Sequence, residues 1–106
     1  MVRRAGATLK ITVADTAEKA LDAADFILCS IRVGGAAGRI ADERIALSHG
    51  LLGQETIGAG GWAMALRSIP AVLEYARLAH RVAPKAWLLN FTNPVGIVLQ
   101  APQNAL

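Results

Sequence analysis

Two carboxamides, Asn90 and Asn93, follow an apolar segment at residues 86–89 and are the most informative chemical groups in the chain. In open α/β folds, ligands bind outside the carboxyl ends of parallel strands. Amides that emerge from such an end are therefore candidates for holding a substrate or a cofactor. A second interpretation is that Asn93 caps the next helix, with Pro94 at its first position, which requires no ligand. The local residues leave both interpretations open.

Two arginines, Arg32 and Arg39, follow a second apolar segment at residues 26–31. Guanidinium groups bind anions in a bidentate manner, so an arginine at this edge of a sheet could hold an anionic substrate. Most loop arginines are only solvated, however. Glu55 lies in a glycine-rich stretch, where its charge could tune the pKa of a nearby catalytic group or belong to a solvated turn.

The other ionisable residues give weaker signals. Asp42 and Glu43 are adjacent, so on a helix they diverge by about 100° and make a poor acid and base pair. We interpret them as charges in the first turn of a helix. His49 and His80 have no Cys, His or carboxylate at a metal-ligand spacing, so we predict no metal ligands within this chain.

The composition limits the class of protein. The length of 106 residues allows one domain or part of one. Hydrophobic residues make up 54% and charged residues 18%, which suggests surfaces that pack against further protein and hints at a fragment. The net charge of +3 is scattered and aromatics are only 5%, so we expect no nucleic-acid partner.

The hydrophobic segments predict neither a membrane span nor a secreted protein. The apolar runs are far shorter than the roughly 20 residues that a span requires. The first four residues, Met-Val-Arg-Arg, lead into no signal-peptide core. We therefore expect a cytoplasmic protein with no membrane partner.

Hydrophobic periodicity predicts alternating strands and helices. Leu9 to Val13 alternates as a short strand does, and Asp15 with Glu18 has the spacing of a capping box for a helix that reaches Ala24. Phe26 to Ile31 reads as a buried strand of a parallel sheet. The order strand, helix, strand predicts a crossover unit.

The second half of the chain has a different pattern. Residues 32–61 are rich in glycine and predict a long loop with a short helix at 42–49. Ser68 and Pro70 predict the start of a helix that Pro84 ends. A strand at 86–91 and a helix at 94–100 follow. The predicted fold class is α/β, as part of a doubly wound, Rossmann-like parallel sheet that lacks a Gly-x-Gly-x-x-Gly turn.

Several short segments, taken in order, form a recognisable pattern. They are Arg32-Val-Gly-Gly, Arg39, Asp42-Glu-Arg-Ile, Gly50-Leu-Leu-Gly-Gln-Glu-Thr, Gly58-Ala-Gly-Gly, Ala65-Leu-Arg-Ser-Ile-Pro and Asn90-Phe-Thr-Asn-Pro-Val-Gly. Together they resemble the central signature of glycoside hydrolase family 4, and most closely its 6-phospho-β-glucosidases. The resemblance covers about residues 25–101. Ala46, Ser48 and His49 replace the usual Pro, Lys and Tyr, and Ser68 replaces Thr.

The resemblance implies NAD-dependent hydrolysis of a glycosidic bond, which is an exception to the scheme of two catalytic carboxylates. NAD takes a hydride from C3 of the sugar, a tyrosine removes the C2 proton, and the leaving group is eliminated. Water then adds and the hydride returns. A divalent metal, typically manganese, polarises the C3 oxygen. The implied substrate is a phosphorylated sugar glycoside, and the full-length protein is expected to be a homo-oligomer.

The resemblance also assigns roles to residues. Arg39 and Asn93 match substrate-binding positions. Asn90 is predicted to bind the cofactor from its place at the strand end. Glu55 matches a carboxylate that raises the basicity of the catalytic tyrosine, because a nearby negative charge disfavours the phenolate. Residues 1–106 are then a partial NAD-binding domain. The glycine-rich turn would precede it and the metal ligands, the acid and the base tyrosine would follow it, so we expect the 106-residue chain alone to be inactive.

Two other functions are compatible with the residues. An Asn-Pro-Val segment after a strand and an arginine-bearing loop also occur in 2-hydroxy acid dehydrogenases of the lactate and malate type. The chain could also be a non-catalytic α/β module. Turnover of NAD separates the first alternative, because a dehydrogenase accumulates NADH and a family 4 enzyme does not.

Overall fold

The computed structural model describes residue 6 and residues 8–106, so the predicted absence of a signal-peptide core at residues 1–4 lies outside the described part. The structure is mixed α/β, as the sequence predicts, but two helices follow one another between the two strands. The elements are α1 (Ala17–Leu21), β1 (Phe26–Cys29), α2 (Gly35–Ser48), α3 (Gly58–Val82), β2 (Trp87–Asn90) and α4 (Val95–Ala105).

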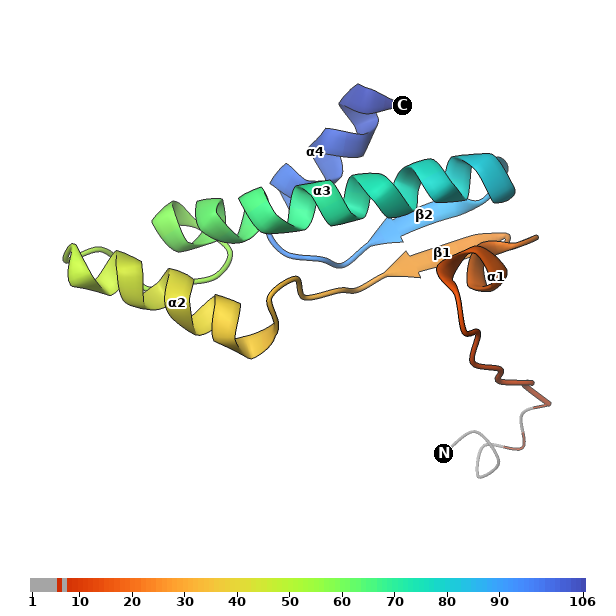
Figure 1. The fold of residues 1–106 in the computed structure, drawn as a ribbon, viewed down its shortest axis with the longest axis horizontal. Coiled ribbons are helices and arrows are strands. Elements are labelled where there is room, and N and C mark those ends of the chain that lie inside the picture. The colour runs from red at the N-terminus through yellow and green to blue at the C-terminus, as the bar shows by residue number, and fades with distance from the viewer. Residues whose placement is uncertain (1–5, 7) are drawn as a thin grey trace.

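The two strands form a parallel pair, with Phe26 beside Trp87 and Cys29 beside Asn90. The connection between them consists of α2 and α3. The C-terminal part of α3 runs along the strand pair, and its N-terminal part extends beyond the carboxyl ends of the strands (Figure 1). α2 lies beyond the carboxyl ends of the strands, whereas α1 lies at the opposite end, beside β1 (Figure 1). This arrangement brings α2 and the segments that follow β1 and β2 to the same end of the sheet.

The core lies between the sheet and helices α3 and α4. Cys29 of β1, Val72 of α3 and Val98 of α4 form the buried cluster, and partly buried apolar side chains pack against it. The thiol of Cys29 is free and buried, as the apolar surroundings of this residue in the sequence suggest.

Within the described residues, no helix covers the opposite face of the sheet. The parallel register places Phe26 beside Trp87 and Leu28 beside Leu89, and these side chains are between 45% and 70% exposed. Apolar side chains gathered on one face of a sheet agree with the expectation that this chain has surfaces for further protein. No helix in the described part of the chain is long and apolar enough to cross a bilayer.

The predictions for the N-terminal segment were partly wrong. Leu9 to Val13 forms no strand, and the side chain of Val13 is 96% exposed. A strand requires a hydrogen-bonded neighbour, and in the described residues β1 pairs only with β2. α1 begins after Thr16, whose Oγ1 accepts a hydrogen bond from the Lys19 N–H at 3.3 Å, while Asp15 pairs with Lys19 Nζ.

The long loop predicted at residues 32–61 was also wrong, because most of it is helical. α2 spans 14 residues, and its Asp42 and Ala46, one turn apart, are buried. Packing against α3 overrides the low helix propensity of the glycines. The buried face of α2 contains Asp42 and Ala46 and no large apolar residue, so the hydrophobic periodicity gave no signal for it.

The predicted start of a helix at Ser68 and Pro70 was wrong as well, because α3 starts at Gly58 and runs through Pro70. Proline removes one backbone hydrogen bond, but the buried stripe continues across it without a break. This stripe consists of Gly60, Gly61, Met64, Ala65, Ser68, Val72, Ala76 and Ala79. The predicted strand at 86–91 and helix at 94–100 are present as β2 and α4, with shifted ends.

Candidate functional site

Three side chains from separate segments converge on the carboxylate of Glu55. Nη1 of Arg32 donates to Glu55 Oε2 at 2.6 Å, and Nε of Arg39 lies 3.4 Å from the same oxygen. The Nδ2 group of Asn93 donates to Glu55 Oε1 at 3.4 Å. The structure therefore brings Arg39, Asn93 and Glu55, which the sequence predicts as site residues, into one constellation beyond the strand ends.

The position of Glu55 depends on two glycines in the first turn of α3. A Cβ atom added at Gly60 would lie 2.4 Å from the backbone oxygen of Gln54, and one at Gly61 would lie 2.5 Å from the carbonyl carbon of Thr56. The segment that carries Glu55 thus rests directly on the helix backbone. Gln54 Oε1 accepts hydrogen bonds from the N–H groups of Thr56 and Ile57 and fixes the turn.

Arg39 lies on α2 and is held there by its own helix. Its Nε donates to Oε1 of Glu43, one turn later, at 2.7 Å. The hydrogen bond to Glu43 and the charges of Glu43 and Glu55 raise the pKa of Arg39 above its ordinary value. Both contacts use Nε, and the side chain is 46% exposed. The two terminal amino groups are therefore placed to bind an anion.

Asn93 does not cap the following helix. α4 begins at Val95, and its cap residue, Pro94, makes no side-chain capping bond. The capping interpretation was therefore wrong, because the carboxamide points across the site to Glu55 instead. The role of Asn93 in substrate binding stays a prediction.

Asn90 uses both polar atoms of its side chain within its own loop. Nδ2 donates to the backbone oxygen of Thr92, and Oδ1 accepts from the N–H of Thr92, both at 3.1 Å. Thr92 is 2% exposed, and its Oγ1 accepts from the N–H of Ile31 at 3.1 Å. Asn90 thereby shapes the loop after β2, and Thr92 links this loop to the segment after β1. Its assignment to the cofactor stays a prediction.

The electrostatics keep Glu55 ionised. The hydrogen bond from Arg32 is the largest cause that lowers the pKa of this carboxyl group, and the charges of Arg32 and Arg39 and the contact with Asn93 act in the same direction. Partial burial raises the pKa and opposes them. Along the site, positive and negative groups alternate from Arg32 through Glu55 and Arg39 to Glu43.

A polar hollow adjoins this cluster at the ends of the strands. Its volume is about 140 Å³, and Arg32 and Asn93 form part of its wall together with Ser30, Ile31, Met64 and Phe91. Ligand sites usually measure about 300–1,000 Å³, so this hollow fits only part of a dinucleotide or a sugar.

A second ion pair supports the site and was missed in the sequence. Asp42 is 5% exposed and receives both Nη atoms of Arg67 from α3. Gly34 and Gly38 make room, because a Cβ atom at either would lie within 3.2 Å of the Arg67 side chain. The interpretation of Asp42 and Glu43 as first-turn charges was wrong, since both lie in the interior of α2.

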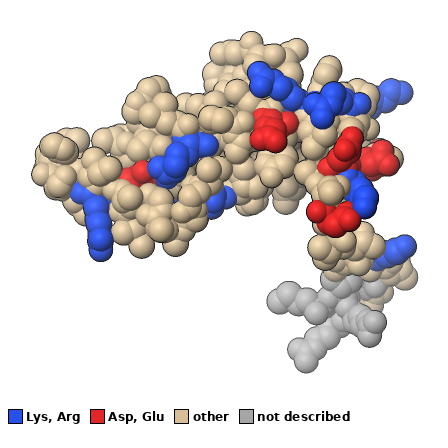
Figure 2. Space-filling model, in the orientation of Figure 1, with Lys and Arg blue, Asp and Glu red and all other residues tan. Residues whose placement is uncertain are grey.

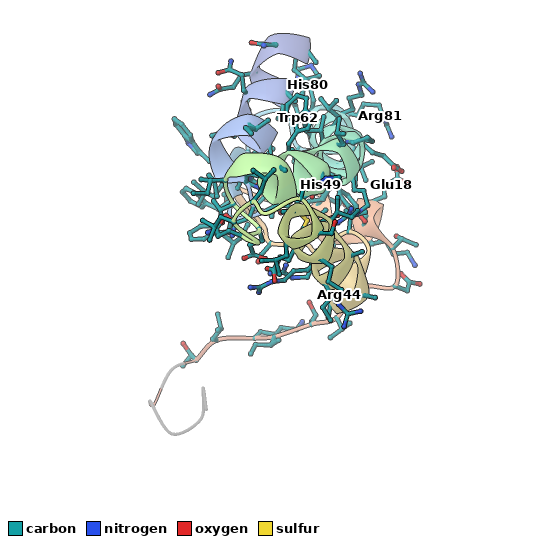
Figure 3. All side chains as sticks on the ribbon, turned by 90° about the vertical axis from the view of Figure 1, so that its left-hand side faces the viewer. Glu18, Arg44, His49, Trp62, His80 and Arg81 are labelled. Carbon is teal, nitrogen blue, oxygen red and sulfur yellow. The ribbon has the colours of Figure 1, made fainter. Side chains whose placement is uncertain are left out.

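The other ionisable groups form no further site in the described part of the chain. No group of three or more His, Cys, Asp or Glu residues in residues 6 and 8–106 is placed to hold a metal ion. His49 follows α2 and His80 lies near the end of α3 (Figure 3). On the face drawn in Figure 2, acidic and basic side chains lie interspersed, most of them over the end of the molecule that carries α1.

Comparison with known proteins decides the family. The sequence profile of the family 4 glycosyl hydrolases matches residues 1–105 of this chain. The chain belongs to glycosyl hydrolase family 4. This membership confirms the resemblance and favours the glycosidase interpretation over the two alternatives.

Some relatives of this chain are named as β-glucosidases and others as α-glucosidases. The 6-phospho-beta-glucosidase of Escherichia coli is 45% identical over 101 residues, which are 95% of this chain and 22% of that protein. The phospho-alpha-glucosidase PagL of Clostridium acetobutylicum is 48% identical over 84 residues, which are 79% of this chain and 19% of that protein.

A solved family 4 structure has the same backbone arrangement. It is a 6-phospho-beta glucosidase from Thermotoga maritima with manganese, NAD+ and glucose-6-phosphate. The TM-score is 0.81 at 41% identity, over 88% of this chain and 23% of that one. The chain thus spans about a fifth of the length of the family members that it matches.

Proposed function

We propose that this chain is the central part of an NAD- and divalent-metal-dependent family 4 glycosidase that hydrolyses 6-phospho-glucosides. The observation that carries the proposal is the convergence of Arg39 and Asn93 on Glu55. These residues come from α2, the loop after β2 and the loop before α3. The assignment fits a site in which a guanidinium can bind an anionic group and a carboxamide can bind a hydroxyl group of the same small ligand.

In this proposal Arg39 binds the sugar phosphate. Glu43 holds Nε, so the orientation of the guanidinium is restricted, and its terminal amino groups make no hydrogen bond within the described residues. Such a pre-oriented fork binds a phosphate oxygen pair at a smaller entropic cost than a free side chain. Asn93 donates to, or accepts from, a sugar hydroxyl next to it.

In this proposal Glu55 raises the basicity of the catalytic tyrosine and does not react with the substrate itself. Its carboxylate stays charged at neutral pH because Arg32 and Arg39 lower its pKa. A fixed negative charge raises the pKa of a neighbouring tyrosine and makes its phenolate a stronger base. We place that tyrosine in a part of the enzyme outside this chain.

The cofactors are bound mainly outside this chain. NAD, when bound, supplies a hydride acceptor that returns the hydride at the end of the cycle. The polar hollow at the strand ends fits part of that molecule. The described residues hold no cluster of metal ligands, so they do not fit a manganese site of their own. We assign the metal ligands to the part of the enzyme that follows.

We further propose that the substrate is a β-glucoside. Support comes from the segments that resemble 6-phospho-β-glucosidases and from 45% identity with the E. coli 6-phospho-beta-glucosidase over 95% of the chain, although a solved 6-phospho-alpha-glucosidase covers 98% of the chain at 32% identity. An assay with both anomers of a 6-phospho-glucoside tests this point. Faster cleavage of the α-anomer would contradict it.

The experiment transfers residues 25–101 into the E. coli 6-phospho-beta-glucosidase in place of the matching segment. We expect this chimera, with NAD and manganese, to hydrolyse a 6-phospho-β-glucoside while the total NADH stays constant. Arg39→Ala should raise KM for the phosphorylated substrate about tenfold or more, since a charged contact to phosphate is lost, and should change NAD binding less than about twofold.

The matched control is Arg44→Ala, because Arg44 lies on the side of α2 that faces away from α3 and α4 (Figure 3). This variant should behave as the parent chimera. Equal losses of phosphosugar and NAD binding in Arg39→Ala would contradict the role of Arg39. Accumulation of NADH with a 2-hydroxy acid would support the dehydrogenase instead.

A further inference from the structure

Arg32 makes the shortest of the three contacts to Glu55. Its Nη1 lies 2.6 Å from Oε2, whereas Arg39 and Asn93 each lie 3.4 Å from a carboxylate oxygen. The side chain of Glu55 is 15% exposed and that of Arg32 is 40% exposed, so the pair is partly shielded from water. The family resemblance gives Arg32 no role in the reaction.

The backbone holds both ends of this pair in place. Next to Arg32, the N–H of Ile31 donates to Thr92 Oγ1 at 3.1 Å, and the carbonyl of Arg32 accepts from the N–H of Gly35 at 3.1 Å. On the other side, Gly60 and its neighbour fix the segment of Glu55 against α3. A short contact between two anchored segments orients the side chains that make it.

We propose that Arg32 is a positioning residue that orients the carboxylate of Glu55 and balances its charge, so that Arg39 is left to bind the substrate anion. This inference rests on the proposed function. Because Arg32 already donates a hydrogen bond to Oε2, Arg39 can release its longer contact with that oxygen when a phosphate binds. Glu55 then keeps a cationic partner, and its orientation does not depend on the substrate.

Two observables separate this role from a merely structural one. In the 106-residue chain, the carboxyl carbon signal of Glu55 should titrate below the ordinary range of glutamate, and Arg32→Gln should move that pKa upward. Arg39→Gln should move it less, because its contact is longer. Arg44→Gln, the matched control, should not move it.

In the chimera, removing Arg32 leaves the charge of Glu55 less balanced. A stronger negative field raises the pKa of the base, so the acid limb of the pH profile of kcat should move to higher pH. A unit charge about 10 Å away in water corresponds to a shift of roughly 0.3 pH units, and a drier site gives more. Arg32→Lys keeps the charge and should restore the position of the limb. KM for the phosphosugar should change less than in Arg39→Ala.

The outcomes distinguish the two proposals. An inactive chimera in which Arg32→Gln still raises the pKa of Glu55 would contradict the proposed function and support the contact. An unchanged titration of Glu55 in Arg32→Gln would overturn the inference. If the chain gives no resolved spectrum, the pH profile of the chimera is the test. An acid limb that does not move in Arg32→Gln, although kcat falls, would also overturn the inference.

Discussion

The substitution Gly60→Ala tests how the fold positions Glu55. Gly60 has helical geometry without a positive φ, so an alanine fits the backbone conformation, and only space opposes it. The new Cβ atom would lie 2.4 Å from the backbone oxygen of Gln54. Because that atom belongs to the backbone, no side-chain rotation relieves the contact, and the segment that carries Glu55 has to move by about 1 Å.

The expected cost follows from two opposing effects. Overpacking a tight contact costs about 1–3 kcal/mol, and a backbone neighbour belongs in the upper part of that range. Replacing glycine by alanine in a helix returns about 0.5–1 kcal/mol. The free energy of unfolding should therefore fall by about 1–2 kcal/mol. At Gly96 in α4 a Cβ atom meets nothing within 4 Å, so Gly96→Ala should raise it by about 0.5 kcal/mol.

Urea denaturation followed by circular dichroism measures the stability of both variants. Carboxyl NMR of Glu55 reports the second consequence, because displacement of the segment lengthens the contact with Arg32 and moves the pKa of Glu55 upward. A Gly60→Ala variant that is as stable as Gly96→Ala, with an unchanged Glu55 titration, would refute this account of how the site is built.

Three further predictions concern single groups. Asp42→Ala leaves Arg67 without its partner and should lower the free energy of unfolding by about 3 kcal/mol in urea denaturation. The pKa of Glu55 is lower in the folded state than in the unfolded state, so the stability that its charge contributes is present at neutral pH and is lost as the pH falls through the folded pKa. The free energy of unfolding, measured from pH 7 to pH 3, should therefore fall less steeply in Glu55→Gln than in the parent. Thr92→Val leaves the N–H of Ile31 unpaired and should cost about 1–3 kcal/mol by thermal denaturation.

Each of these predictions has a control and a contradicting result. Asp15→Ala breaks an exposed ion pair and should change stability by no more than about 0.5 kcal/mol. Thr12→Val, at an exposed position, should be neutral within about 0.5 kcal/mol. Equal effects in Asp42→Ala and Asp15→Ala, or in Thr92→Val and Thr12→Val, would contradict the buried contacts. A Glu55→Gln variant with the parent's pH dependence would contradict the lowered pKa.

The sequence predicts these two strands well because apolar runs and the polar residues after them are local signals. Residues 26–29 and 87–90 lie within the predicted strands, and the residues after them reach a common edge as the parallel arrangement requires. Asn93 reaches the site because it follows β2. Arg39 and Glu55 reach it through α2 and the first turn of α3, which the sequence did not predict.

The helices between the strands were harder to predict because tertiary packing determines them. α2 has few apolar residues on its buried side, and its burial of Asp42 makes sense only once Arg67 from α3 is present. Pro70 looked like the start of a helix because a local rule was applied without the buried stripe that continues across it. The contact of Arg32 with Glu55 joins residues 23 positions apart and has no local signature.

The most direct test of the central claim is a crystal structure of the chimera with NAD, manganese and glucose 6-phosphate. We predict that the phosphate lies within hydrogen-bonding distance of the terminal amino groups of Arg39, that a sugar hydroxyl contacts Asn93, and that Arg32 still holds Glu55. A phosphate bound elsewhere, with Arg39 and Asn93 both out of contact with the sugar, would contradict the account.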